Sequence, residues 1–132
     1  MLNSIETIAL HWPASALNLS ENDYTSFLNH EDMYIESRLM KWVGQEAYND
    51  AKSVNPANPL RAKCLKEAEL YLFHVSCMQK LWRDCGLGRE KSVTLPSGMS
   101  VQLTSLIESE YKALIQYYLD EAYRICEDYL CL

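Results

Sequence analysis

Hydrophobic and polar residues follow one another along most of this chain with the spacing of α-helices. In the segment 20–54, apolar side chains recur three or four residues apart, at Tyr24, Phe27, Leu28, Ile35, Leu39 and Val43. Ser20 precedes this series as a helix cap, and Asp23 stands at the capping-box position. Gly44 marks a stop or a kink, and Asn-Pro pairs within residues 55–59 break the helical pattern. The pattern predicts a first helical segment over residues 20–54.

Two further helical patterns follow. The first covers residues 60–85, with apolar positions at Leu65, Ala68, Leu72, Val75, Met78, Leu81 and Trp82, and Gly86 stands where a left-handed C-terminal cap belongs. The second covers residues 104–131 and has two apolar stripes: Ile107, Tyr111, Leu114, Tyr118, Ala122, Ile125 and Tyr129, and then Ile115, Leu119, Tyr123, Cys126 and Leu130. A surface helix normally shows a single apolar face. We therefore expect this helix either at the centre of the fold or in contact with another chain.

The remaining segments predict less regular structure. Polar and apolar residues alternate over residues 92–103 on either side of Pro96-Ser97-Gly98, which is typical of a β-hairpin. Residues 1–18 are expected to form a partly extended N-terminal arm. The predicted fold class is mainly α: one domain over residues 1–132, with three long helices in a small bundle and a short β-hairpin between the second and the third.

Composition and charge narrow the possible functions. The chain has 132 residues, 12 basic and 18 acidic, for a net charge of −6. Such a chain has no surplus of cations with which to bind nucleic acid through bulk charge. No stretch reaches the roughly 18 apolar residues that a membrane span needs. The first residues show neither the cationic nor the apolar region of a signal peptide, so we expect synthesis in the cytoplasm and no membrane partner.

The cysteines and histidines predict neither a disulfide framework nor a metal site. The five cysteines are an odd number, and with no signal peptide we expect free, mostly buried thiols; a disulfide framework is the minority interpretation. His74 and Cys77 are three residues apart, but nothing nearby completes a ligand set and the chain has no Cys-x-x-Cys motif. No cofactor is expected.

Catalytic signatures are missing from the sequence as well. No nucleophile-elbow or related pattern surrounds the Ser, Cys, His and Asp residues, so the chain is not expected to be an enzyme. Seven basic residues in and after the second predicted helix are interpreted as solvated surface, with contact to an acidic protein as the alternative. Nine of the fourteen aromatic residues are tyrosines, which fits a core edge or a protein interface.

The order of the predicted elements resembles the small head–tail connector (head-completion) proteins of tailed bacteriophages. The resemblance rests on the run Tyr34-Ile35-Glu36-Ser37-Arg38-Leu39-Met40-Lys41-Trp42-Val43-Gly44-Gln45-Glu46-Ala47-Tyr48, a Pro-rich break, a long helix with Ala68-Glu69-Leu70-Tyr71-Leu72, a small β-element and a C-terminal helix. In that family the first helix closes on a glycine followed shortly by a tyrosine, as Gly44 and Tyr48 do here. The resemblance covers residues 17–130. The long, tyrosine-rich last helix and the short hairpin depart from the family pattern.

The resemblance implies a structural virion protein. Connectors of this kind assemble as rings, commonly twelve-fold, below the portal protein; they extend the DNA channel and provide a docking surface for the tail or a second connector. DNA would then be only a passing cargo. For the interfaces of such a ring we single out seven residues: Trp12, Leu95, Met99, Val101, Leu103, Tyr117 and Tyr123.

Two other classes of protein remain open at this point. A cytosolic helical adaptor or regulator would bind one protein partner through a groove and would be monomeric or dimeric. A small enzyme with an unrecognised site would need a deep pocket lined by convergent polar groups.

Overall fold

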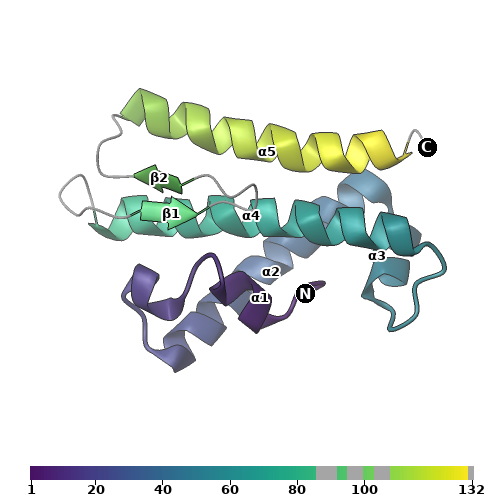
Figure 1. The fold of residues 1–132 in the computed structure, drawn as a ribbon, viewed down its shortest axis with the longest axis horizontal. Helices are drawn as coiled ribbons and strands as arrows, with labels where there is room; N and C mark the ends of the chain where they lie inside the picture. Colours follow the sequence, from purple (N-terminus) through teal and green to yellow (C-terminus); the bar gives the residue numbers. More distant parts are fainter. Residues whose placement is uncertain (86–91, 95–99, 103–107, 131–132) are drawn as a thin grey trace.

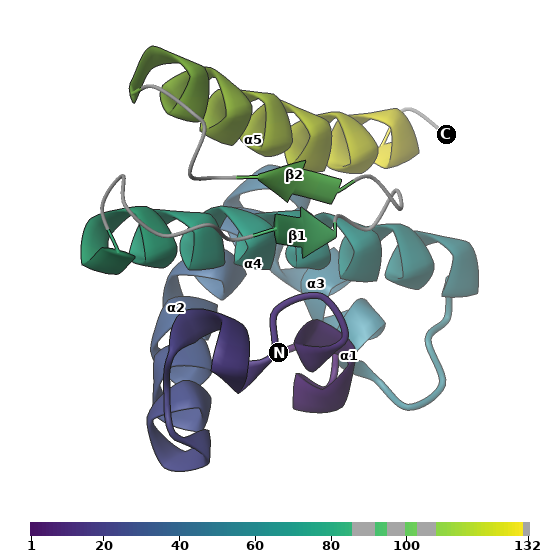
Figure 2. The same ribbon diagram turned by 60° about the vertical axis from the view of Figure 1, so that its left-hand side comes forward.

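Three long helices form the body of the molecule, α2 (Glu21–Val43), α4 (Pro59–Cys85) and α5 (Glu108–Leu130). This computed structural model describes residues 1–85, 92–94, 100–102 and 108–130. Helices α4 and α5 run antiparallel along their length, and α2 crosses α4 at a steep angle (Figures 1 and 2). The mainly α class predicted from the sequence is therefore right.

Two pairs of aromatic side chains lie along the contact between α4 and α5. The ring of Trp82 stacks on Tyr111 with 4.2 Å between the centroids, and further along, the rings of Tyr71 and Tyr118 lie 6.1 Å apart. The two contacts are eleven residues apart on α4 and seven apart on α5, close to whole numbers of helical turns, which keep one face of each helix toward its partner. The central helix is α4, and α5 packs along it at the edge of the molecule, so the predicted central position of the last helix is corrected (Figure 1).

The first predicted helical segment consists of two helices. α2 begins after Ser20, whose Oγ accepts a hydrogen bond from the Asp23 amide at 3.2 Å, as the capping pattern predicted. It ends at Gly44, which has φ +90° and ψ 155°. The short helix α3 (Gln45–Lys52) starts there, and the Tyr48 amide donates to the Gly44 carbonyl. A glycine tolerates this positive φ at little cost, so the chain changes direction at this point.

The loop between α3 and α4 is organised by one carboxylate. The side chain of Asp50 accepts hydrogen bonds from the amides of Ala57 and Asn58 and from the Arg61 guanidinium. These bonds, the one from Ala57 first, lower the pKa of Asp50. Asn58 caps α4 by accepting from the Arg61 amide, and Pro59 takes the first helical position, where a missing N–H costs nothing.

The N-terminal segment corrects the predicted partly extended arm. Residues Ile5–Ala9 form the helix α1, capped by the Ser4 side chain, and Ala14–Leu17 form a 3-10 turn, η1. Ile8, Trp12 and Leu17 are buried in the main core. Because so short a helix is unstable alone, its formation depends on these tertiary contacts, which the local sequence does not reveal.

The predicted three-helix bundle with a β-hairpin is also wrong as a description of the fold. The described residues contain five α-helices, and the predicted hairpin forms no layer of the structure. Its extended part is limited to three pairs, between β1 (Ser92–Thr94) and β2 (Ser100–Gln102), with Val93 opposite Val101. An alternating pattern shows which residues share a side but does not set how many of them pair. Residues 95–99 and 103–107 lie outside the described part of the chain.

Candidate protein-binding surface

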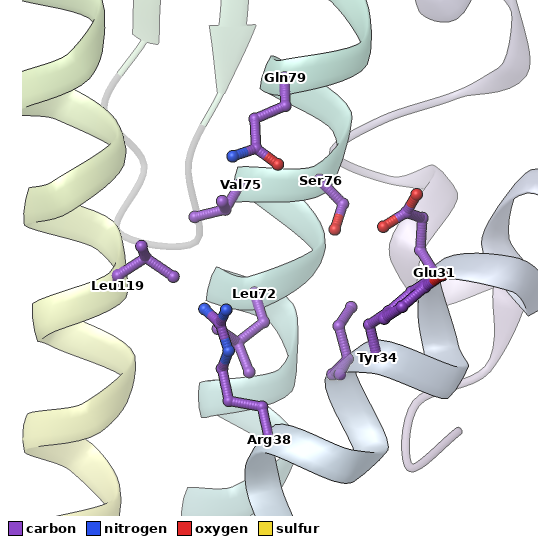
Figure 3. A pocket seen from close by; sticks show the side chains of 9 residues that line it. Glu31, Tyr34, Arg38, Leu72, Val75, Ser76, Gln79 and Leu119 are labelled. Carbon is purple, nitrogen blue, oxygen red and sulfur yellow. The ribbon is translucent and has the colours of Figure 1, made fainter.

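A cleft of about 260 Å³ opens between α2, α4 and α5 (Figure 3). Buried apolar side chains contribute to it, with Ile35 from α2 and Leu72 and Val75 from α4. The other lining residues are Glu31, Tyr34, Arg38, Ser76, Gln79 and Leu119. The cleft thus combines apolar walls with charges of both signs, which is the composition of a binding groove.

A row of aromatic and cationic side chains follows α2 beside this cleft. His30, Tyr34, Arg38 and Trp42 stand four residues apart, so they share one face of the helix. The rings of His30 and Tyr34 meet edge to face at 5.3 Å, and the Arg38 guanidinium lies 6.0 Å from the Trp42 ring centroid. We call these four residues the α2 row.

The α2 row continues onto α5. The ring of Tyr123 meets Trp42 edge to face at 5.2 Å between centroids. Tyr123 is 46% exposed and Tyr34 is 62% exposed, so both rings present large faces to solvent. Exposed tyrosine, tryptophan and arginine side chains are typical of protein interfaces. The cleft and the α2 row together form the candidate protein-binding surface.

The seven predicted interface residues have different positions in the structure. Tyr117 and Tyr123 are exposed on α5, and of these two Tyr123 contacts the α2 row. Val101 lies in β2, and Leu95, Met99 and Leu103 fall outside the described residues. Trp12 is 1% exposed, so its prediction as an interface residue is corrected: it is a core residue.

The prediction from sequence missed Tyr34 and Arg38. Their signal was present as the four-residue spacing of His30, Tyr34, Arg38 and Trp42, but Tyr34, Arg38 and Trp42 entered the prediction only as part of the run that carries the resemblance. The cleft itself has no sequence signal, because it is formed by three helices that are distant in the chain.

The neighbouring pair of His74 and Cys77 is buried. Burial, reinforced by the neighbouring His11, lowers the pKa of His74 to about 3, so the imidazole is neutral at physiological pH. Burial raises the pKa of the Cys77 thiol, which keeps it protonated. The described residues contain no group of three or more His, Cys, Asp or Glu side chains placed to hold a metal ion.

A buried carboxylate on α4 holds the start of the chain. Glu69 is fully buried, and its two oxygens accept hydrogen bonds from the amides of Leu2 and Asn3 at 2.7 and 2.9 Å and from the Asn3 side chain at 3.0 Å. Burial raises the pKa of Glu69, while these hydrogen bonds oppose the rise. The α-amino group of Met1 pairs with Asp32 of α2 at 3.1 Å. These contacts fasten the N-terminal segment to the helices.

Two of the basic residues considered from sequence form ion pairs within the chain. Arg61 lies 3.3 Å from Asp50, and Lys80 lies 2.7 Å from Asp84. Lys63, Lys66 and Arg83 are exposed on α4.

None of the helices in the described ranges combines the length and the apolar character required to cross a membrane. No protein-family model matches the sequence, and neither the curated proteins nor the solved structures contain a match.

Proposed function

We propose that this protein is a head–tail connector of a tailed bacteriophage. It assembles as a ring below the portal protein, extends the DNA channel and offers the docking surface for the tail. The proposal rests on the resemblance in sequence, and the observation that carries it concerns the two residues of the family pattern, Gly44 and Tyr48.

Both residues have positions that the fold requires. Gly44 has φ +90°, which side chains other than glycine rarely adopt, and it separates α2 from α3. Tyr48 is fully buried, and its amide donates to the Gly44 carbonyl at 3.2 Å. A glycine followed four residues later by a tyrosine therefore has a physical reason in this chain, which supports the comparison with connectors.

The candidate binding surface supplies one of the contacts that a ring needs. A ring of identical subunits closes through two different, complementary surfaces on each subunit. We propose that the neighbouring subunit covers the cleft and the α2 row. The exposed rings of Tyr34 and Tyr123, which flank apolar walls, support a contact that removes apolar surface from water.

The charge of the chain agrees with a channel component. With a net charge of −6, a ring of these subunits repels the phosphate backbone and lets DNA slide. On this proposal the protein acts without enzymatic activity or cofactor. It is made in the host cytoplasm and incorporated into the virion, where it contacts the portal protein and the tail or a second connector.

The test uses the full chain and the portal protein encoded by the same genome. Purified protein is mixed with assembled portal, and the complexes are examined by native mass spectrometry and negative-stain electron microscopy. We expect a ring seated on the portal. The double variant Tyr34→Ala/Tyr123→Ala should lose the ring. The control is Met33→Ala, which should retain the ring because Met33 is exposed on α2, beside Tyr34, but does not line the cleft. Absence of any complex with the wild-type chain would refute the connector function.

A cytosolic adaptor is the second candidate, and the cleft formed by three helices favours it. An adaptor would bind one partner in a one-to-one complex and would form no ring with portal. Light scattering after size-exclusion chromatography measures that stoichiometry. Portal and major capsid genes beside the gene for this chain would favour the connector over the adaptor.

A further inference from the structure

The contact between α4 and α5 sets a register in which two cysteines face each other. Trp82 of α4 stacks on Tyr111 of α5, and eleven residues earlier on α4, Tyr71 lies against Tyr118, seven residues later on α5. The helices are antiparallel, so residues nearer the start of α4 lie beside residues nearer the end of α5 (Figure 1). One helical turn on from the contact of Tyr71 with Tyr118, the next residues of the two facing sides are Ala68 and Ala122.

These two alanines allow the helices to approach closely. Ala68 and Ala122 are both fully buried at the contact. Helix axes lie nearer to each other where the facing side chains are small. One further turn along each helix lie Cys64 and Cys126, which this register places opposite each other. Disulfides form between cysteines whose Cα atoms lie about 4.4–6.8 Å apart, a separation that is favoured beside a close helix crossing.

The two thiols differ in their access to solvent. Cys126 is buried, whereas Cys64 is only half-buried, and both are free. Burial, and to a smaller extent the charge of a neighbouring Cys64 thiolate, raise the pKa of Cys126 to about 12, which agrees with the proximity of the two thiols. Cys64 is therefore the thiol that an external oxidant reaches first, and Cys126 is the inner partner.

We propose that Cys64 and Cys126 are a redox modification site, at which a reversible disulfide joins α4 to α5. With glutathione disulfide as the oxidant, the Cys64 thiolate attacks one sulfur of that disulfide, forms a mixed disulfide and releases one glutathione thiolate. The Cys126 thiolate then attacks Sγ of Cys64 and releases the second glutathione. The two cysteine protons pass through solvent to the two glutathione thiolates, so two electrons reduce one glutathione disulfide.

The bridge would connect the start of α4 to the end of α5. The loop that this bridge closes contains most of α4, most of α5 and the segment between them, so the bridge restricts the unfolded chain strongly. The thiols stay reduced in a reducing cytoplasm, and the disulfide forms when the protein enters an oxidising environment. This inference does not depend on the proposed connector function, because it concerns only the contact between two helices of one chain.

Peptide mapping of the full chain tests the proposal. The reduced protein is incubated with glutathione disulfide, free thiols are blocked with N-ethylmaleimide, and the protein is digested without reductant for mass spectrometry. We expect a cross-linked peptide pair containing Cys64 and Cys126, lighter by two hydrogens than the sum of the reduced peptides. The melting temperature should rise by about 5 °C or more and return to its starting value with dithiothreitol.

Three variants separate this bridge from other effects of oxidation. Cys64→Ser, at a half-buried position, should fold but form no bridge and show no rise in melting temperature. Cys126→Ala should also form no bridge, whereas Cys77→Ala removes a buried thiol elsewhere on α4 and should still form it. Alkylation of both Cys64 and Cys126 after oxidation would overturn the proposal. So would a glutathione adduct that remains on Cys64, a bridge from Cys64 to another cysteine, or a bridge between two chains.

Discussion

The indole N–H of Trp12 donates a hydrogen bond to Nδ1 of His74, which lies 62 residues later in the chain. Both side chains are buried. Since Nδ1 accepts this bond, the proton of the neutral imidazole resides on Nε2, which has no hydrogen-bond partner among the described residues. The hydroxyl of Tyr24 donates to the Trp12 carbonyl at 2.6 Å, so α2 joins the same contact. This buried polar group fastens the N-terminal segment to α2 and α4.

Replacing Trp12 with phenylalanine should destabilise the protein. The change leaves Nδ1 of His74 buried without its donor and removes part of a buried ring, for an expected loss of about 2–4 kcal/mol in the free energy of unfolding. Urea denaturation followed by circular dichroism measures this loss. Trp42→Phe, at a half-buried position of the α2 row, is the control and should cost less than about 1 kcal/mol. Equal losses in the two variants would contradict the structural role of the hydrogen bond.

The stability of the protein should fall in acid because of His74. Its folded-state pKa is lowered from 6.5 to about 3. Between these values the unfolded chain binds a proton that the folded chain does not, so the free energy of unfolding decreases as pH falls from about 6.5 toward 3. The decrease approaches about 1.4 kcal/mol per pH unit.

The variant His74→Asn isolates this effect. Asparagine retains an acceptor oxygen for Trp12 but does not titrate. The pKa of Glu69 is raised by burial, so its contribution has the opposite sign and is lost as pH rises through the folded-state value. Both proteins share Glu69, and its effect cancels in their difference. We expect the advantage of the wild-type protein over His74→Asn to shrink from pH 6.5 to pH 4; parallel stability curves would contradict the prediction.

Glu69→Gln should loosen the start of the chain. The glutamine retains one acceptor oxygen but places an NH₂ group where the carboxylate accepts a second backbone amide, so one of the Leu2 and Asn3 amides loses its partner. We expect a loss of about 1–3 kcal/mol at neutral pH and faster hydrogen exchange at both amides. Glu67→Gln, at an exposed position of the same helix, should leave both measurements near the wild-type values.

Gly44→Ala should destabilise the connection between α2 and α3. An added Cβ would meet no atom within 4 Å, so the cost comes from the backbone, which has φ +90° at this residue. We expect a loss of about 1–3 kcal/mol, measured by urea denaturation. The control is Gln45→Ala. Gln45 is the exposed neighbour in the first turn of α3, and its replacement should change the free energy of unfolding little. An unchanged stability of Gly44→Ala would mean that the backbone adopts another conformation there.

Local signals in the sequence determined much of the helical structure. The Ser20 cap predicted the start of α2 to the residue, and the predicted range 60–85 differs from α4 by one residue at its start. Caps and helical spacing depend on neighbours within one or two turns, so they can be interpreted without tertiary contacts. The same spacing revealed that the last helix has apolar residues on more than one face, and α5 contacts both α4 and α2.

Only the tertiary structure decided what the N-terminal segment and the polar core residues do. Trp12 looked like an interface residue of an extended arm, yet it is buried because His74 and Tyr24 offer partners to its indole and carbonyl groups. Glu69 looked like an ordinary charged residue of a helix, yet its carboxylate accepts from amides 66 and 67 residues away. Local spacing carries no information about contacts between distant segments. The cleft beside Tyr34 and the facing thiols of Cys64 and Cys126 exist only because separate helices pack together at one angle and in one register.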